Sequence, residues 1–325
     1  MHNIALVGAG RIGRIHARNA ALNPRIHLAG IVDPVAAAAQ SLAQEWNAPV
    51  LELDQVLADP AIAGIVIASS TDTHLDYSLR AAAAGKAIFC EKPIDQDLAR
   101  ARSAHRELSS ARMLLAFNRR FDPNFQALKA RLDGGGIGTL ESLQITSNDP
   151  APPPPAYVAV SGGLFKDMAI HDFDMARWLL GEEPVEVYAA GSCLVDPEIG
   201  KLGDVDTART LLRTAGGKLC VIANSRRSGF GYDQRIEAYA SAGMVRADNV
   251  LESTVQVWGE AGAAADRFQN FFLDRYAEAY RREMEHFADI LDGMTPSVGY
   301  ADGVAALALA EAAAQSVASG KPVTL

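Results

Sequence analysis

The stretch that decides the fold is Ile4-Ala5-Leu6-Val7 followed directly by Gly8-Ala9-Gly10-Arg11-Ile12-Gly13. Four consecutive apolar residues predict a buried strand, and residues 12–22 have the pattern of a helix. The residues between fit GxGxxG: Gly8 permits a tight turn, Gly10 lets backbone amides approach a pyrophosphate, and Gly13 lets the helix pack closely on the strand. The alternative is a purely structural glycine turn, but a strand before the glycines and a helix after them favour dinucleotide binding.

Strand-like and helix-like segments alternate over the first 118 residues. Residues 27–32, 64–68, 87–90 and 113–117 have the apolar character of further strands, and alanine-rich segments near 35–45 and 74–84 predict helices between them. Continuous apolar strands separated by helices predict a parallel sheet covered on both faces, which is the doubly wound Rossmann class of α/β fold. We therefore predict a dinucleotide-binding domain over residues 1–118.

The strand 27–32 leads into Asp33, which is the expected partner of the adenosine ribose. A carboxylate there accepts hydrogen bonds from the 2′- and 3′-hydroxyls and repels a 2′-phosphate. The following Pro34-Val35-Ala36 adds no cationic side chain, so NAD is favoured over NADP. The alternative is that Asp33 is only a turn or cap residue before Pro34.

Polar residues follow two later strands, at the edge where open α/β sheets bind ligands. The run Ser69-Ser70-Thr71-Asp72-Thr73-His74 is expected to line the nicotinamide side, although Asp72 or Thr73 also suits a helix cap. Glu91-Lys92-Pro93 places a lysine at the same edge. Lys92 there can stabilise negative charge developing on a substrate oxygen. The alternative is an ordinary solvated surface lysine.

A second group of titratable residues follows the double glycine Gly162-Gly163, in a helix pattern that ends at Gly181. Asp167, His171 and Asp174 stand at i, i+4 and i+7, so one helical face is predicted to carry all three. Such a face fits a solvated Asp–His pair, a metal site, or general acid–base catalysis in which the histidine takes an alcohol proton while hydride leaves the same carbon. The spacing alone does not choose between these alternatives.

From about residue 119 the pattern changes to a second domain, predicted over residues 119–325. Several strand-like runs in succession predict a large, open, mostly antiparallel sheet in an α+β domain. The proline-rich segment 150–155 predicts a stiff connection next to the substrate pocket. The predicted helices cover 124–132, 267–292 and 301–319, and the predicted strands cover 140–147, 185–195, 207–213, 218–224, 235–240 and 255–258.

Composition limits the classes of partner. The chain has 325 residues and a formal charge of −9, which argues against DNA, RNA or an anionic membrane as the main partner. We find neither a basic-then-apolar start nor a long uninterrupted apolar run, so no signal peptide and no transmembrane helix are expected. Three widely spaced cysteines without a CxxC motif are typical of reduced thiols in a cytoplasmic protein.

Taken together, these motifs resemble those of the Gfo/Idh/MocA oxidoreductase family. They are the GxGxxG strand-turn-helix, the Glu91-Lys92-Pro93 triplet and the Asp-x-x-x-His-x-x-Asp motif at 167–174. The resemblance covers essentially the whole chain, and residues 117–122, 162–180, 203–207 and 232–235 resemble the inositol 2-dehydrogenase branch in particular. One departure is Ala169, where many members carry glycine or a small polar residue.

The resemblance implies a catalytic set of Lys92, Asp167 and His171, with His171 as general acid/base. Lys92 and Asp167 would hold the substrate hydroxyls and tune the proton transfer. Tyr232 matches a tyrosine that reaches the substrate, and Asn148 is a further candidate for polyol hydroxyls. Asp174 is expected to be a supporting residue, and no metal is expected. The residues expected to bind NAD are Gly8, Gly10, Arg11, Ile12, Gly13, Asp33, Ser69, Thr71, His74, Glu91 and Lys92.

The resulting functional expectation is NAD-dependent oxidation of a ring secondary alcohol of a polyol, with myo-inositol oxidised to 2-keto-myo-inositol (scyllo-inosose). The alternatives are another inositol stereoisomer, an aldose oxidised at C1, and a non-catalytic NAD-binding sensor or co-repressor. The presence of Lys92, Asp167 and His171 together argues against a sensor. The resemblance also implies a homo-oligomer, most commonly a tetramer, paired through the face of the open sheet opposite the substrate.

Overall fold

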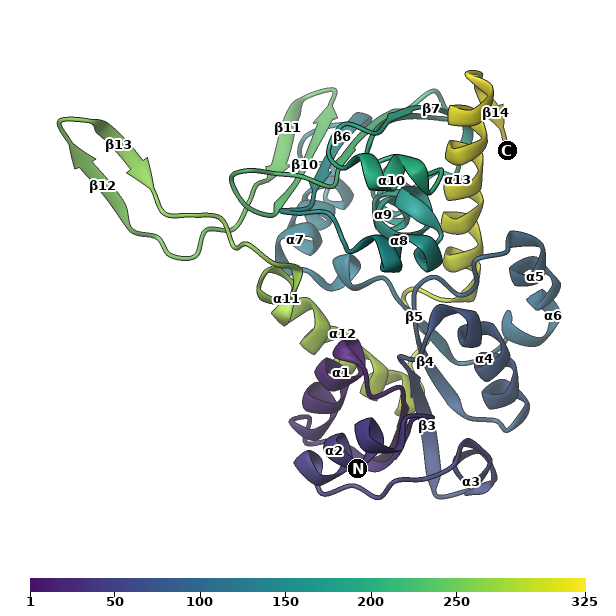
Figure 1. The fold of residues 1–325 in the computed structure, drawn as a ribbon. Helices are drawn as coiled ribbons and strands as arrows, with labels where there is room; N and C mark the ends of the chain where they lie inside the picture. Colours follow the sequence, from purple (N-terminus) through teal and green to yellow (C-terminus); the bar gives the residue numbers. More distant parts are fainter. The chain divides into compact units, whose positions relative to one another are not determined.

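The computed structural model describes all 325 residues, which form two compact units (Figure 1). Unit 1 comprises residues 1–121 and 279–307, and unit 2 comprises residues 122–278 and 308–325. Residues 279–307 belong to unit 1, although the sequence analysis had placed them in the second domain. Their place follows from apolar packing: the ring of Phe287 lies edge-on to that of Phe89, with centroids 5.7 Å apart, and Met284 is fully buried.

Unit 1 is built on five parallel strands in the order β2-β1-β3-β4-β5, which confirms the predicted Rossmann sheet. The strands are β1 (His2–Val7), β2 (Ile26–Val32), β3 (Ile62–Ile67), β4 (Ala87–Glu91) and β5 (Met113–Ala116). The helices are α1 (Arg11–Ala21), α2 (Ala36–Trp46), α3 (Leu53–Ala58), α4 (His74–Ala83), α5 (Leu98–Ser103), α6 (His105–Leu108), most of α12 (Ala277–Leu291) and the start of α13 (Tyr300–Ser319), with 3-10 turns at Thr71–Thr73 and Asn118–Phe121.

The strand order of unit 1 locates its binding edge. The chain passes from β1 to β2 on one side and continues with β3 on the other side of β1, so the order reverses between β1 and β3. Ligands of open α/β sheets bind beyond the carboxyl ends of the strands at such a switch point. The glycine motif follows β1 and the run 69–74 follows β3, so both lie at this edge.

Unit 2 contains a seven-stranded sheet in the order β11-β10-β6-β9-β8-β7-β14. Only the pair β6/β9 is parallel, which confirms the predicted mostly antiparallel sheet. The strands are β6 (Leu140–Asn148), β7 (Pro184–Ser192), β8 (Thr207–Thr214), β9 (Leu219–Ser225), β10 (Asp233–Ala240), β11 (Gly243–Ala247) and β14 (Val323–Thr324).

Short helices and one hairpin complete unit 2. The helices are α7 (Pro123–Asp133), α8 (Pro155–Ser161), α9 (Ile170–Leu180), α10 (Pro197–Lys201), α11 (Phe272–Arg275) and the end of α13. The hairpin of β12 (Gln256–Gly259) and β13 (Gly262–Ala265) extends away from the rest of the unit (Figure 1). No helix of the protein is both long enough and apolar enough to cross a membrane.

The helix predicted over 267–292 is wrong in its first part. Phe268 instead forms an antiparallel bridge with Leu251, and its ring lies edge-on to that of Phe230. The backbone amide of Gln269 donates to Val250 O at 3.0 Å. These strand-like bonds and the ring contact hold the segment extended, so the long helix α12 begins only at residue 277. Further along, the aromatic residues Tyr276, Tyr280 and Phe287 are buried.

Candidate active site

The glycine motif forms a turn too tight for side chains at two of its three glycines. A Cβ on Gly8, which has φ of 103°, would lie 2.4 Å from the carbonyl oxygen of Ala68. A Cβ on Gly13 would lie 1.9 Å from the carbonyl oxygen of Gly8. Gly10 differs, because no atom lies within 4 Å of its Cβ position. Gly10 caps α1 without a side-chain hydrogen bond, so the first-turn amides, from Arg11 onward, remain available to an anion.

The carboxylate of Asp33 is held against this turn. Its Oδ2 accepts a hydrogen bond from the backbone amide of Ala9 at 2.7 Å, and its Oδ1 accepts one from that of Val35 at 2.8 Å. The bond to Val35 is the predicted turn role, and the bond to Ala9 places the carboxylate beside the glycine motif. A carboxylate has about four acceptor sites, so both oxygens keep capacity for the ribose hydroxyls.

The run after β3 is organised by hydrogen bonds. Ser69 Oγ and Thr73 Oγ1 are 2.6 Å apart. The ring of His74 is buried, with Nδ1 2.8 Å from Pro93 O and Nε2 3.1 Å from Ser69 O. His74 therefore ties the loop after β3 to the loop after β4. Thr71, at the start of the 3-10 turn, is partly exposed, and the role of these residues in cofactor contact remains a prediction.

Beneath the end of β4 lies a buried acidic cluster. Glu91 Oε1 is 2.6 Å from Nε2 of His16, which is fully buried on α1. Glu283 of α12 is also fully buried, and neither of its carboxyl oxygens has a hydrogen-bond partner. Burial, and secondly the charge of Glu91, raises the pKa of Glu283 well above its ordinary value. Lys92, which follows Glu91, is partly exposed, and the Lys92–Pro93 peptide bond is cis.

Replacement of Glu283 by glutamine is expected to stabilise the protein above neutral pH. Unfolded glutamate loses its proton near pH 4.3, whereas folded Glu283 keeps it, because its pKa is raised. The folded state then binds more protons than the unfolded state, so stability falls with rising pH by about 1.4 kcal/mol per unit until the folded pKa is reached. Glu283→Gln removes this loss.

Urea denaturation at pH 5 and pH 8 tests this expectation. The stability gain of Glu283→Gln over wild type should be larger at pH 8 than at pH 5. Glu285→Gln, a change to a partly exposed residue on the same helix, is the control and should alter stability by less than about 1 kcal/mol at either pH. An equal loss of stability in Glu283→Gln at both pH values would contradict the account.

In unit 2 the predicted histidine helix contains an irregularity that changes its faces. Residues Phe165–Ala169 form a π-helical turn, and α9 starts at Ile170. Asp167 and His171 are partly exposed, whereas Asp174 is fully buried and lies 3.9 Å from Arg177. The predicted regular helix is therefore interrupted between Asp167 and His171, whereas His171 and Asp174 keep their three-residue spacing within α9. Single π-turns occur frequently at functional sites.

Asp167 is held by two side chains that the sequence analysis did not single out. Tyr157 Oη donates to Asp167 Oδ1 at 2.9 Å, and Nη1 and Nη2 of Arg226 are each 3.4 Å from Asp167 Oδ2. Tyr157 lies on α8, directly after the proline-rich segment. Tyr157 could have been found from the sequence, because it directly follows a proline-rich segment expected to lie next to the substrate pocket. Arg226 could not, because it is far from Asp167 in sequence and, beside Arg227, resembles a surface residue.

The remaining substrate candidates gather at one edge of the unit 2 sheet. Asn148 ends β6 and pairs in register with Ser225 at the end of β9 and with Asp233 at the start of β10. Asn148 Nδ2 donates to Asp233 Oδ2 at 3.1 Å, and its Oδ1 has no partner. Tyr232 adjoins Asp233, and Arg226 follows Ser225. Polar side chains from three neighbouring strand ends therefore meet at this edge.

Helix α9 is fixed to the same edge. Asn224 Nδ2, near the end of β9, donates to Asp172 Oδ2 at 2.8 Å, and both residues are fully buried. Asp172 adjoins His171 in the chain, so the backbone at His171 is anchored. No group of three or more His, Cys, Asp or Glu side chains has the arrangement of a metal site.

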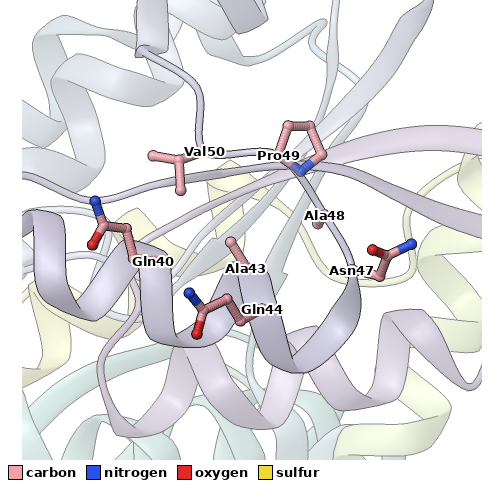
Figure 2. A pocket seen from close by; sticks show the side chains of 7 residues that line it. All are labelled: Gln40, Ala43, Gln44, Asn47, Ala48, Pro49 and Val50. Atoms are coloured by element: carbon pink, nitrogen blue, oxygen red, sulfur yellow. The ribbon is translucent and has the colours of Figure 1, made fainter.

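A hollow of about 450 Å³ lies elsewhere in unit 1, on the surface of α2 and the segment after it (Figure 2). Its walls carry amide side chains and small apolar groups, with no titratable residue. The lining residues are Gln40, Ala43, Gln44, Asn47, Ala48, Pro49 and Val50. None of them belongs to the predicted site, so this hollow offers no acid–base chemistry.

Known proteins match the chain over its whole length. It is 46% identical over 323 residues to the inositol 2-dehydrogenase of Rhizobium meliloti (strain 1021), covering 98% of each chain. The structure of a myo-inositol dehydrogenase from Corynebacterium glutamicum superposes with a TM-score of 0.96 at 45% identity, covering 100% of this chain and 99% of that one. A scyllo-inositol dehydrogenase from Lactobacillus casei, solved with NAD(H) and scyllo-inositol, has a TM-score of 0.91 at 28% identity, covering 100% and 99%.

Family models match both parts of the chain. Residues 2–118 match the oxidoreductase family with an NAD-binding Rossmann fold, and residues 125–246 match the GFO/IDH/MocA C-terminal domain. The predicted resemblance and the predicted NAD cofactor are therefore confirmed. The chain belongs to the Gfo/Idh/MocA family of NAD-dependent oxidoreductases.

Proposed function

We propose that this oxidoreductase converts myo-inositol to 2-keto-myo-inositol with NAD. The observation that carries the proposal is the 46% identity, over 98% of both chains, to an inositol 2-dehydrogenase. The residues Lys92, Asp167 and His171, which the resemblance assigns to catalysis, all stand in this sequence. The substrate is accordingly a polyol, and its chemistry is that of a secondary alcohol.

The residues of the chain divide the reaction between them. NAD, when bound, supplies the hydride acceptor. His171 takes the hydroxyl proton, so the O–H and C–H bonds of the carbinol break while the C=O bond forms. Lys92 stabilises the negative charge that develops on the oxygen. Asp167 orients a neighbouring hydroxyl and favours the protonated imidazole. General acid–base catalysis of this kind contributes about 10²–10⁴-fold.

The position of His171 suits the base role. Its neighbours Ile170 and Asp172 are buried and fix the start of α9, while His171 itself remains partly exposed. An imidazole has an ordinary pKa near neutral, so it accepts and returns a proton at physiological pH. Anchored backbone on both sides restricts the region that the ring can occupy, which favours the positioning of a catalytic base.

Isotope labelling tests the site of oxidation. With myo-inositol deuterated at C2, the expected result is deuterium in the reduced cofactor, detected by mass spectrometry, and slower turnover when hydride transfer limits the rate. myo-Inositol deuterated at C5 serves as the control and should yield unlabelled NADH. Transfer of deuterium from C5, or no transfer from either carbon, would refute oxidation at C2.

We further propose that the protein is a homo-oligomer, a tetramer, that pairs through one face of the unit 2 sheet. Register places Tyr188, Leu211 and Val221 directly opposite one another on β7, β8 and β9, and Tyr239 opposite Met244. Cross-strand partners share a face, and each of these side chains is about 40% exposed or more. Exposed apolar side chains that lie next to one another on neighbouring strands, as Tyr188, Leu211 and Val221 do, mark protein interfaces.

A charge placed in this patch is expected to dissociate the oligomer. Leu211→Glu buries an unpaired carboxylate at every copy of the interface, which is strongly unfavourable. Light scattering coupled to size-exclusion chromatography should show a smaller species than wild type. Leu194→Glu is the matched control, because Leu194 is 68% exposed and lies outside the sheet. An unchanged mass for Leu211→Glu would mean that this face does not pair subunits.

A further inference from the structure

A buried arginine stands behind the proposed catalytic carboxylate. The side chain of Arg226 is 2% exposed, and its Nη1 and Nη2 each lie 3.4 Å from Oδ2 of Asp167, which is 15% exposed. The backbone amide of Arg226 donates to Asp206 O at 2.8 Å, so the residue is fixed at its main chain as well. A full positive charge therefore faces the carboxylate from the end of β9.

The geometry of the Arg226–Asp167 pair is poor for an ion pair that stabilises the fold. Both contacts are long for charge-assisted hydrogen bonds, and Nε of Arg226 is buried without a partner. Taking a guanidinium out of water costs several kcal/mol, and an imperfect pair recovers that cost incompletely. The pair therefore contributes little to stability, and its main effect is electrostatic.

Other charges around Asp167 are directed elsewhere. Lys166 pairs with Glu311 at 3.1 Å. The carboxylate of Asp204 accepts the amide of Leu164, and that of Asp206 accepts backbone amides of residues 194–196. Asp172 on α9 accepts from Asn224. Tyr157 from α8 is neutral, and Arg226 is a cation that faces Asp167.

We propose that Arg226 is a positioning residue of the dehydrogenase reaction, which holds the Asp167 carboxylate in place while limiting how strongly that carboxylate attracts a proton to His171. This inference rests on the proposed function, since it needs Asp167 and His171 as the proton-transfer pair. An uncompensated carboxylate would keep the imidazole protonated and remove the free base that alcohol oxidation requires. The positive charge of Arg226 sets the balance between these two demands.

Three variants separate charge from packing. Arg226→Met removes the charge and keeps most of the volume, Arg226→Lys keeps the charge, and Arg227→Met changes the exposed neighbour. For Arg226→Met we expect kcat/KM for the polyol to fall about tenfold, as for loss of one charge-assisted interaction. The acid limb of its pH profile should move to higher pH by roughly half a unit or more. Arg226→Lys should have a kcat/KM and an acid limb close to those of wild type. Arg227→Met should equal wild type in both quantities.

Further measurements keep the result independent of folding and of substrate. All three variants should keep a cooperative thermal unfolding transition, which reports that they are folded, and the dissociation constant of NADH, which unit 1 determines, should be unchanged. The NMR titration of ¹³C-labelled His171, assigned by its loss in His171→Asn, should have a higher midpoint in Arg226→Met than in wild type. This readout needs no turnover, so it tests the inference even if the polyol proves to be a different one.

An unshifted His171 titration and pH profile in Arg226→Met would overturn the inference, since a purely structural role lowers stability without moving either. Failure of Arg226→Lys to recover the wild-type profile would also overturn it, because the charge would then not be the cause. Absence of polyol oxidation by the wild type, with the His171 midpoint still shifted in Arg226→Met, would instead count against the proposed function alone.

Discussion

Replacement of His171 by alanine is expected to lower kcat/KM for polyol oxidation by about 10²–10⁴-fold, the contribution typical of a general base. The loss arises because no other group then takes the hydroxyl proton as hydride leaves. Structural damage should be small, because His171 is partly exposed while Ile170 and Asp172 carry the packing of this turn. Steady-state kinetics, with NADH binding measured by fluorescence, separates catalysis from cofactor affinity.

The control for this experiment is His27→Ala, which changes an exposed histidine of β2. It should leave kcat/KM and NADH affinity at wild-type values. In His171→Ala the acid limb of the pH profile should also disappear, since the titrating base is gone. Turnover within a few-fold of wild type, with an unaltered pH profile, would show that His171 is not the base.

Substitution of Gly13 by alanine is expected to raise the dissociation constant of NAD by roughly 100-fold, about 3 kcal/mol of binding free energy. A Cβ at this position would lie 1.9 Å from the carbonyl oxygen of Gly8, so α1 must move away from β1. The amides at the start of α1 then lose their alignment with the pyrophosphate. Thermal unfolding should also show destabilisation by about 1–3 kcal/mol, as for other overpacked positions.

Gly10→Ala is the informative comparison. No atom lies within 4 Å of its Cβ position, so the folded apoprotein should keep wild-type stability. The methyl group occupies the open side of the motif, where the pyrophosphate approaches the backbone, and NAD affinity should fall about tenfold. Unchanged NAD affinity in Gly10→Ala would mean that the pyrophosphate binds elsewhere and that the glycines serve only the turn.

Local motifs predicted unit 1 well because their chemistry is local. Gly13 is required by a contact with Gly8 inside one strand-turn-helix, and Gly8 by a contact with Ala68, which directly follows the neighbouring strand β3. Asp33 reaches Ala9 because β2 pairs directly with β1. Parallel β1 and β3 then bring Ser69 to the same edge. Each step follows from apolar runs and strand order, so the binding edge could be inferred without coordinates.

The predictions for unit 2 failed at the places where tertiary interactions determine the local structure. The segment around Phe268 has helical periodicity, yet pairing with Leu251 and the ring of Phe230 hold it extended. The predicted regular helix through Asp167 and His171 is also interrupted, by the π-turn at 165–169. Neither the non-local pairing nor the extra helical residue leaves a signal in hydrophobic periodicity.

Long-range partners of the candidate site were also beyond a reading of the sequence. Arg226 is 59 residues from Asp167, and only the register of β9 against β6 brings the end of that strand to the site edge. Glu283 is charged in sequence and lies on an amphipathic helix, which predicts a solvated face. Its burial follows from the packing of α12 in unit 1.

The most direct test of the central claim is the initial rate of NADH formation across a panel of polyols. The panel comprises myo-, scyllo- and D-chiro-inositol, glucose, galactose and xylose, each assayed with NAD and with NADP at mildly alkaline pH. The account predicts the highest kcat/KM for myo-inositol with NAD, and a marked preference for NAD because Asp33 repels a 2′-phosphate. Turnover of an aldose alone would contradict the proposal that the substrate is an inositol. No turnover of any compound in the panel, despite tight NADH binding, would contradict the proposal that the protein is a polyol dehydrogenase.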